Sequence, residues 1–340
     1  MILDASKTVL VTGGAGYIGS HACKALAAAG YLPVTLDNLS KGHAWAVRWG
    51  PLERVDLRDR RGVDEVLERH RPTACLHFAG LIEVGESVND PALYYDVNTA
   101  GTLTLLTALR DHGVKRFIFS STCAIYGVPE RLPLTEDHPR RPINPYGASK
   151  AAVEAMLEDF SRAYDFRYAA LRYFNAAGGD PAGEIGEAHQ PETHLIPLVL
   201  DAALGRRPHV AIYGQDYPTP DGSCVRDYIH VDDLAEAHRL ALAWLERGGE
   251  SGAFNLGNGQ GFSVRQVIET ARRVTGREIE AVEAPRRPGD PPFLIGDARR
   301  AREILGWTPR RPELETILGD AWRWRQRLFS SHDCPGENGP

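Results

Sequence analysis

A glycine-rich turn near the start of the chain constrains its fold more than any other feature. Residues 12–19 read Thr-Gly-Gly-Ala-Gly-Tyr-Ile-Gly, follow an apolar run at 8–11 and precede a helix-forming stretch at 20–29. In a strand, turn and helix of this kind, Gly13 permits the tight turn, Gly16 lets a ligand approach the backbone and Gly19 allows close helix packing. The helix N-terminus then offers unpaired N–H groups to an anion. The pattern predicts a dinucleotide pyrophosphate site, whereas the same glycines in isolation would indicate an ordinary turn.

Short apolar runs alternate with helix-length segments along the first half of the chain. The runs lie at residues 8–11, 33–36, 74–78, 116–120 and 168–172. Such alternation is typical of parallel strands joined by right-handed helical crossovers. We therefore expect an α/β fold with a Rossmann-like, doubly wound parallel sheet.

The pattern changes after Asn175, where Gly, Pro and His residues cluster before Leu195. Such a cluster is typical of a domain boundary. We expect a dinucleotide-binding domain at 1–175, with 226–255 returning to it. A smaller α/β substrate-binding C-terminal domain would comprise 176–225 and 256–329. The polar, Gly- and Pro-containing tail at 330–340 is expected to be disordered.

Composition excludes several classes of protein. The chain of 340 residues carries a net charge of −6 and has no long basic run, which argues against nucleic acid as a partner. Its five cysteines lack C-x-x-C spacing, so we expect neither a zinc site nor a disulfide framework, and no other metal site is expected. We see no signal peptide and no stretch approaching the roughly 20 apolar residues of a membrane helix. These features predict a cytoplasmic protein.

Asp37 lies eighteen positions after Gly19, at the end of the second expected strand. A carboxylate there accepts from the ribose 2′-hydroxyl of NAD and repels the 2′-phosphate of NADP. Asn38 follows it where a basic residue would favour NADP, so NAD is the expected cofactor. For Asp56 two interpretations stay open, an approach to the adenine and a plain helix cap.

Tyr146 and Lys150 are four residues apart at the start of an expected helix and share one of its faces. A phenol has a pKa near 10, and acting as a base at neutral pH requires a fall of roughly three units, or about 4 kcal/mol. A lysine ammonium and a positively charged nicotinamide favour the phenolate. Thr122, two residues after the 116–120 run, is the hydroxyl expected beside Tyr146, with Ser120 and Ser121 as the alternatives. A surface Tyr–Lys pair is the alternative, which the upstream glycine turn disfavours.

The sequence resembles the extended short-chain dehydrogenases/reductases. Among them it is similar to the UDP-galactose (UDP-glucose) 4-epimerase group over nearly the whole length, excluding the tail. The motifs that carry the resemblance lie at 12–21, 36–39, 77–81, 84–87, 94–96, 117–121, 146–150, 171–175, 214–218 and 225–231.

The resemblance implies roles for individual residues. Tyr146 would be the catalytic base, Lys150 would bind the nicotinamide ribose and Thr122 would assist. The remaining cofactor-binding positions would be Gly13, Gly16, Tyr17, Ile18, Gly19, Asp37, Asn38, Asp56, Leu57, Phe78, Ala79, Gly80, Asn98 and Phe174. Ile82 departs from the family, some members of which place a lysine there to reach NAD.

Substrate binding requires a diphosphate clamp, for which the planar fork of arginine is suited. Besides Thr122 and Tyr146, the resemblance places the UDP-sugar against Asn175, His194, Leu195, Tyr213, Arg226, Arg287, Asp290 and Leu294. From the residues alone, an arginine beside an aspartate is commonly a surface ion pair instead.

The implied activity is reversible, NAD-dependent inversion at C4 of a UDP-hexose through a transient 4-keto sugar. NAD stays tightly bound throughout, and the likeness implies a homodimer joined through helices at 95–109 and 151–159. Leu294 and His194 leave UDP-N-acetylhexosamines and UDP-pentoses open as substrates. A 4,6-dehydratase or a decarboxylase is the first alternative, although Cys123 and Ala124 stand where dehydratases place Asp-Glu. A non-catalytic NAD-sensing protein is the second.

Overall fold

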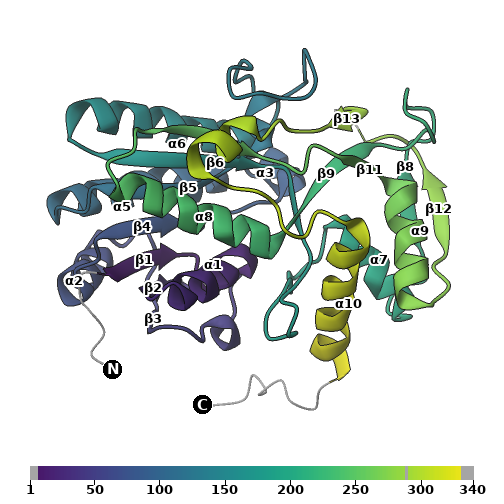
Figure 1. The fold of residues 1–340 in the computed structure, drawn as a ribbon, viewed down its shortest axis with the longest axis horizontal. Helices are drawn as coiled ribbons and strands as arrows, with labels where there is room; N and C mark the ends of the chain where they lie inside the picture. Colours follow the sequence, from purple (N-terminus) through teal and green to yellow (C-terminus); the bar gives the residue numbers. More distant parts are fainter. Residues whose placement is uncertain (1–6, 288–289, 331–340) are drawn as a thin grey trace.

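The structure is a computed structural model that describes residues 7–287 and 290–330 (Figure 1). Within these residues the largest sheet has seven strands, all parallel, in the order β3-β2-β1-β4-β5-β6-β10. The order reverses between β1 and β4, which confirms the doubly wound prediction. The strands are β1 (Thr8–Thr12), β2 (Leu32–Leu36), β3 (Leu52–Glu53), β4 (Ala74–His77), β5 (Arg116–Thr122), β6 (Arg167–Tyr173) and β10 (Gly252–Leu256).

Helices cover both faces of this sheet. One face carries α1 (Tyr17–Ala28) and α8 (Val231–Glu246), and the other carries α2 (Arg60–His70), α5 (Gly101–Asp111) and α6 (Pro145–Ala163). At the carboxyl end of β4 lie α3 (Val84–Asn89), α4 (Pro91–Tyr94) and the π-helix η3 (Tyr95–Ala100), which runs into α5. Short helical turns lie at η2 (Ala44–Ala46), η4 (Cys123–Tyr126) and η5 (Ala301–Leu305).

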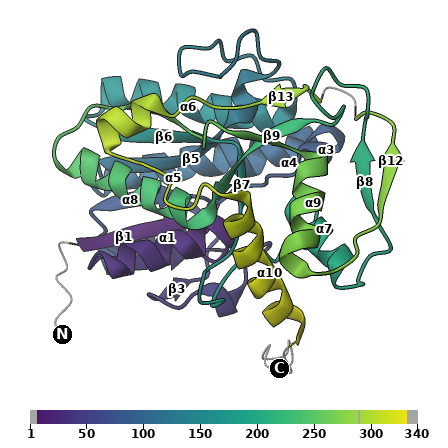
Figure 2. The same ribbon diagram turned by 45° about the vertical axis from the view of Figure 1, so that its right-hand side comes forward.

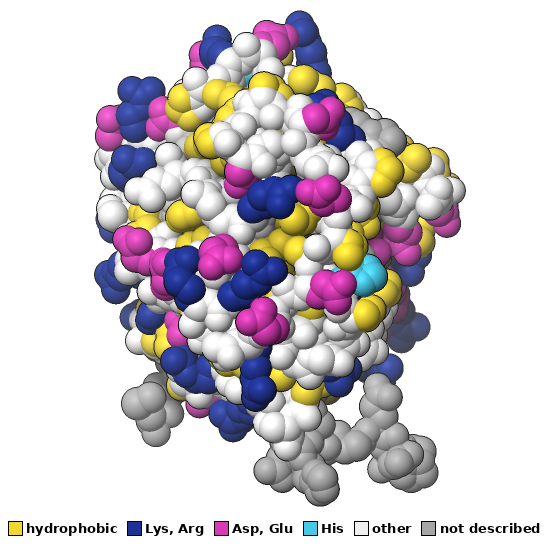
Figure 3. Space-filling model, turned by 90° about the vertical axis from the view of Figure 1, so that its right-hand side faces the viewer, with side chains coloured by type: hydrophobic (Ala, Val, Ile, Leu, Met, Phe, Trp, Pro, Cys, Tyr) yellow, Lys and Arg dark blue, Asp and Glu magenta, His cyan; other side chains and the backbone are white. Residues whose placement is uncertain are grey.

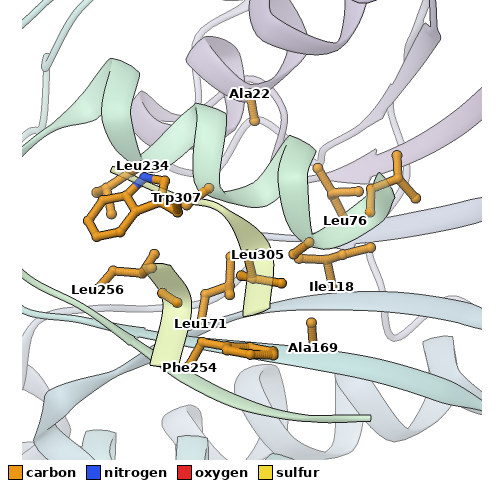
Figure 4. Packing of buried hydrophobic residues seen from close by; sticks show 14 of the residues in the cluster. Ala22, Leu76, Ile118, Ala169, Leu171, Leu234, Phe254, Leu256, Leu305 and Trp307 are labelled. Atoms are coloured by element: carbon orange, nitrogen blue, oxygen red, sulfur yellow. The ribbon is translucent and has the colours of Figure 1, made fainter. Parts of the chain in front are cut away.

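The core beneath α8 contains a segment from near the C-terminus. Figure 4 shows Leu305 and Trp307 packed among Leu171, Phe254 and Leu256. The Trp307 indole donates to the carbonyl of Asp233 in α8 at 2.8 Å. Residues 298–307 therefore pack against the large sheet, whereas the sequence placed all of 256–329 in the second domain. Burial of these apolar side chains contributes roughly 1.5–3 kcal/mol each, and the composition of so short a segment does not reveal which core it joins.

A second region is built around smaller sheets (Figure 2). In one of them β9 (Val225–His230) pairs with β7 (Asn175–Ala177), β11 (Gly261–Ser263) and β13 (Phe293–Leu294). In the other β8 (Val210–Tyr213) pairs with β12 (Ala281–Ala284). Their core includes apolar faces of α7 (Leu195–Ala203), α9 (Val264–Thr275) and α10 (Leu314–Ser330).

The chain between 226 and 255 is shared by the two regions. Strand β9 lies in the smaller sheet, while α8 and β10 return to the large one. Of the expected disordered tail, Ser330 is the last residue of α10, and 331–340 lie outside the described residues.

Two features of the surface bear on partners. Figure 3 shows one face on which positive and negative side chains are interspersed, without a field of one sign. Over the described part of the chain, no helix combines the length and the apolar character needed to cross a bilayer.

Candidate active site

The glycine turn lies at the carboxyl edge of the large sheet, between β1 and α1. Gly13 has φ of 73°, and a Cβ there would lie 2.5 Å from the amide nitrogen of Ala79, which follows β4. A Cβ on Gly19 would lie 2.2 Å from the carbonyl oxygen of Gly13. Any side chain would therefore push the turn away from α1 and from the β4 loop. The turn brings the backbone of both loops to the switch point of the sheet, where such folds bind dinucleotides.

Helix α1 begins at Tyr17 with Gly16 as its N-cap, and no described side chain caps it. The first-turn N–H groups, Tyr17 and Ile18 included, are thus available to an anion such as a pyrophosphate. The Tyr17 hydroxyl donates to the carbonyl of Gly178 at 2.8 Å, which joins the glycine turn to the segment after β7.

Asp37 is buried where β2 ends. Its carboxylate accepts from the amides of Ala15 at 3.1 Å and Leu39 at 2.9 Å. These bonds fix the carboxylate beside the glycine turn, at the position that the sequence assigns to ribose recognition.

Asn38 and Asp56 lie together beyond Asp37. The amide of Asn38 donates to Asp56 at 2.9 Å, and Arg58 holds the same carboxylate. Hydrogen bonds from Arg58 outweigh burial and lower the pKa of Asp56. Leu57 instead faces the core beneath α2, so its side chain is not at the surface of the site.

The loop after β4 forms the other side of the switch point. The Phe78 ring packs on His238 with centroids 4.6 Å apart. Asn98 is buried. Its side-chain oxygen accepts from the Leu81 amide at 2.8 Å, and its side-chain nitrogen donates to the Leu81 carbonyl at 3.0 Å. A Cβ on Gly80 would lie 3.0 Å from the Asn98 side-chain oxygen and 3.5 Å from Lys150 Nζ. Asn98 therefore sets the course of the loop that borders the expected cofactor site.

Helix α6 positions Tyr146 and Lys150. It begins at Pro145 because the side chain of Asn144 accepts from the Gly147 amide at 2.8 Å and proline is tolerated at the first helical position. The buried Lys150 ammonium donates to the Ser120 carbonyl at 3.1 Å. Burial lowers the pKa of Lys150 to about 8.

The pKa of Tyr146 differs from the expectation. Burial and the neighbouring Tyr173 raise the pKa of Tyr146 above its ordinary value, and a hydrogen bond with Thr122 opposes them. The sequence predicted that Lys150 would lower this pKa, but burial outweighs any such effect in the protein alone. The structure does bring Thr122 and Tyr146 together, as expected. The positive charge of an oxidised nicotinamide is the remaining factor that favours the phenolate.

The substrate-side residues gather around β9 and β13. Arg226 is mostly buried and pairs with Asp290 at 2.8 Å. Asn175 donates to the carbonyl of Asp227 at 2.9 Å, which joins β7 to β9. Leu294 is paired in register with Arg226 and packs against a small cluster that contains Phe174. Cys123, the residue after Thr122, packs against the same cluster.

Three further residues lie on neighbouring elements. Tyr213 ends β8 with its side chain exposed, and the Arg287 guanidinium lies 4.0 Å from the centre of its ring. His194 is the N-cap residue of α7, and Leu195 is the first residue of that helix.

Glu187 and His189 lie next to His194, and neither was among the residues predicted from the sequence. The His189 imidazole contacts Glu187 at 3.0 Å, and His194 forms a shorter contact with the same carboxylate. With Glu192 these side chains place four possible metal-ligand atoms within 4.8 Å of one another. The only sequence signal is the spacing of two Glu and two His residues within 187–194, which has no unique meaning.

Comparisons with known proteins agree with the motifs. A family model described as "NAD dependent epimerase/dehydratase family" matches residues 9–257. UDP-glucose 4-epimerase of Rhizobium meliloti (strain 1021) is 53% identical over 322 residues, covering 95% of this chain and 98% of that protein. The crystal structure of UDP-glucose 4-epimerase from Brucella ovis in complex with NAD is 51% identical, with a TM-score of 0.91, and the match covers 93% of this chain and 97% of that one.

A third protein is similar over the same span. UDP-glucose-4-epimerase from Stenotrophomonas maltophila, solved with NAD and formylated UDP-arabinopyranose, is 39% identical with a TM-score of 0.92, and the match covers 95% of this chain and 98% of that one. The chain therefore belongs to the NAD-dependent epimerase/dehydratase family, and within it to the group of the UDP-glucose 4-epimerases.

Proposed function

We propose that the protein interconverts UDP-galactose and UDP-glucose by reversible inversion at C4, with NAD as a tightly held cofactor. The observation that carries the proposal is the meeting of Tyr146, Thr122 and Lys150 at the edge of the sheet where Gly13 and the β4 loop converge. The comparisons support it, because relatives about half identical over nearly the whole chain are UDP-glucose 4-epimerases.

Each group has a distinct task. NAD, when bound, supplies the hydride acceptor and donor for C4 of the sugar. Tyr146 removes the proton of the 4-hydroxyl and returns it, and Thr122 hydrogen-bonds the same oxygen. Lys150 holds the nicotinamide ribose, while Asp37 holds the adenosine ribose. The sugar passes through a 4-keto form, and its rotation exposes the opposite face of C4.

The UDP half of the substrate is held away from the reacting carbon. Arg226 and Arg287 bind the diphosphate, Asp290 the ribose and Tyr213 the uracil, with Asn175, His194, Leu195 and Leu294 around the sugar and phosphates. Concentrating binding energy on UDP leaves the sugar free to turn, which inversion requires.

A coupled assay tests the proposal directly. The purified protein, without added NAD, is expected to convert UDP-galactose to UDP-glucose and to release about one NAD per chain when denatured. Formation of a 4-keto-6-deoxy sugar or loss of carbon dioxide would instead indicate a dehydratase or a decarboxylase.

Three finer points belong to the same proposal. We place the protein in the cytoplasm, because the described cysteines are unpaired. We expect a homodimer through 95–109 and 151–159. We divide the chain into a cofactor domain of 1–175 with most of 226–255 and a substrate domain of 176–225 with most of 256–329, with β9 in the smaller sheet and 298–307 packed on the large one.

A further inference from the structure

The segment between β7 and α7 carries a compact cluster of ionisable side chains. Glu187 is 5% exposed, and both His189 and His194 direct Nδ1 at its Oε1 atom. An ionised carboxylate only accepts hydrogen bonds, so both Nδ1 atoms donate. The Oε1 atom of Glu192 lies 4.0 Å from each of these nitrogens.

The charges around His194 favour its imidazolium form. Partial burial lowers the pKa of His194, but Glu187, together with Glu192 and Glu83, outweighs it and raises the pKa to about 9. The cation that faces the cluster from α10 is Arg325, whose Nη1 lies 3.5 Å from Glu192. The two imidazoles in turn outweigh burial and lower the pKa of Glu187. At neutral pH Glu187 and His194 thus form an ion pair.

The second ring nitrogen of His194 is available. Nδ1 is committed to Glu187, no described residue hydrogen-bonds Nε2, and the side chain is 46% exposed. His194 occupies the N-cap position of α7 without a side-chain capping bond, and the helix dipole adds positive potential there. Glu83, whose negative charge also raises the pKa of His194, follows Gly80 in the loop after β4.

Contacts on two sides hold the segment that carries His194 in place. The same segment is anchored to the glycine turn, because Tyr17 bonds Gly178 and its ring meets that of His189 edge to face. It is anchored to α10 by the Trp324 indole, which donates to the carbonyl of Glu187 at 2.9 Å. Figures 1 and 2 show the segment between α1 and α10. A rigidly held cation in such a place is suited to a diphosphate.

We propose that Glu187 is a positioning residue that holds His194 as an imidazolium, whose Nε2–H group binds the diphosphate of the UDP-sugar. This inference rests on the proposed function and adds a third, pH-sensitive cation to Arg226 and Arg287. Two diphosphates occur in such an enzyme, that of NAD and that of the UDP-sugar. Of these two diphosphates, that of the UDP-sugar is favoured, because His194 directly precedes α7, and α7 packs with β8 in the core of the second region.

A divalent metal is the competing occupant of the cluster. Zn²⁺ binds imidazole nitrogens and carboxylate oxygens, both of which this cluster contains. A metal ligand must offer a free lone pair, however, and both Nδ1 atoms here donate to Glu187. The hydrogen bonds therefore favour Nδ1 atoms that carry protons over Nδ1 atoms that bind a metal. Metal binding is one of the outcomes that the test distinguishes.

The test compares Glu187→Gln, His194→Asn and the double variant as NAD-loaded enzymes, with UDP-galactose from pH 6 to 9. In the unaltered protein KM should stay flat up to about pH 8.5. In Glu187→Gln, His194 returns toward its ordinary pKa of about 6.5, so KM should rise about tenfold at pH 8 and recover at pH 6. Changes in kcat should stay within about twofold, because the contact is equal in ground and transition states.

His194→Asn keeps a donor without the charge, and it also serves if Glu187→Gln does not fold. It should raise KM about tenfold at pH 6 to 8 without pH dependence, and adding Glu187→Gln should change nothing further. His189→Gln, which leaves the Glu187–His194 pair intact, is the matched control and should leave KM within about twofold.

Several results would overturn the proposal. A Glu187→Gln effect that is equal at every pH, or that persists on the His194→Asn background, would mean a structural role. Faster NAD release with unchanged KM would assign His194 to the other diphosphate. One equivalent of Zn²⁺ bound through Glu187 and His194 would make the cluster a metal site. If the protein turned over no UDP-sugar, the proposed function would fail, and calorimetry with UDP-glucose would still test the same pH dependence.

Discussion

The guanidinium of Arg287 lies 4.0 Å from the centre of the Tyr213 ring. We assign these residues to different parts of one ligand, the diphosphate and the uracil, yet here they contact each other. A cation–π contact at an exposed site stabilises by about 0.5–1 kcal/mol. If uracil stacks on this face of Tyr213, UDP binding has to replace the contact, so we expect Arg287 to move from the ring to the phosphate as the substrate enters.

Replacing Arg287 with alanine should therefore raise KM for UDP-galactose far more than it lowers kcat. A charged hydrogen bond to phosphate is worth about 1.5–3 kcal/mol, so the expected rise is about 10- to 100-fold. Steady-state kinetics measure both constants.

The adjacent Arg286 offers a matched control. It pairs with Asp216 at 2.6 Å and lies 4.1 Å from the Tyr217 ring, so it has the same chemistry on a neighbouring aromatic side chain. Arg286→Ala should change KM less than about threefold, as is usual for an exposed ion pair. Equal effects of the two substitutions would remove Arg287 from the substrate site.

Tyr146→Phe should lower kcat by about 10²- to 10⁴-fold, the usual contribution of a general acid or base. NAD content should be unchanged, because the substitution removes only the phenolic oxygen. The control is Tyr173→Phe, which removes a nearby partly buried hydroxyl that is hydrogen-bonded to Ser120 at 2.5 Å. Turnover by Tyr146→Phe at the level of Tyr173→Phe would refute the assignment.

Substitution of Leu294 tests which sugars the protein accepts as substrates. Leu294 packs against the small cluster that contains Phe174, as does Cys123, the residue after Thr122, so we expect a larger side chain to narrow the space around the sugar. Leu294→Tyr should lower kcat/KM for UDP-N-acetylglucosamine at least about tenfold more than for UDP-galactose, since steric exclusion of a group costs more than about 1.4 kcal/mol. A parallel loss with both sugars, or with UDP-arabinose as well, would mean that Leu294 does not select at C2.

The elements that the sequence predicted are those set by local pattern. The apolar runs at 8–11 and 116–120 predicted β1 and β5 to within two residues, and the helix expected from Tyr146 begins one residue earlier, at Pro145. The contacts that were missed join distant segments. Nothing near Trp307 indicates that it packs on β10, and nothing near Glu187 indicates that two imidazoles converge on it.

The sign of the Tyr146 pKa shift was missed for the same reason. Spacing places Lys150 one turn from Tyr146, and this argues for a lowered pKa. The degree of burial depends on how β5, β6 and α6 close around the phenol, and burial raises the pKa. Patterns along the chain thus locate chemical groups, while their protonation depends on tertiary packing.

Acid should destabilise the protein through buried histidines. Burial, together with the nearby Lys150, lowers the pKa of His77 to about 3. Its ring nitrogens lie 2.6 and 2.9 Å from the hydroxyls of Thr12 and Thr102. The unfolded chain binds a proton below about pH 6.5 while the folded chain does not, so stability falls as pH decreases from 6.5 toward 3 by up to about 1.4 kcal/mol per unit.

The slope of this pH dependence is the measurement. We expect denaturant unfolding to show that the free energy of unfolding falls less steeply from pH 6.5 to 4.5 in His77→Asn than in the unaltered protein. The difference in slope should correspond to about one bound proton. His238→Asn should act in the same direction, because burial lowers the pKa of His238 to about 4. An unchanged slope in His77→Asn would mean that His77 is protonated in the folded protein.

Two large apolar side chains remain exposed where the dimer is expected. Tyr95 is 44% exposed and Leu103 is 42% exposed, on η3 and α5 of the segment at 95–109. A charge buried in an apolar interface without a partner is costly, so Leu103→Asp should turn a dimer into a monomer at micromolar concentration. Light scattering coupled to size exclusion measures the mass. Val128→Asp, at a position 60% exposed outside both expected interface segments, should remain dimeric. If both variants kept the dimer mass, the two chains would have to meet through another surface.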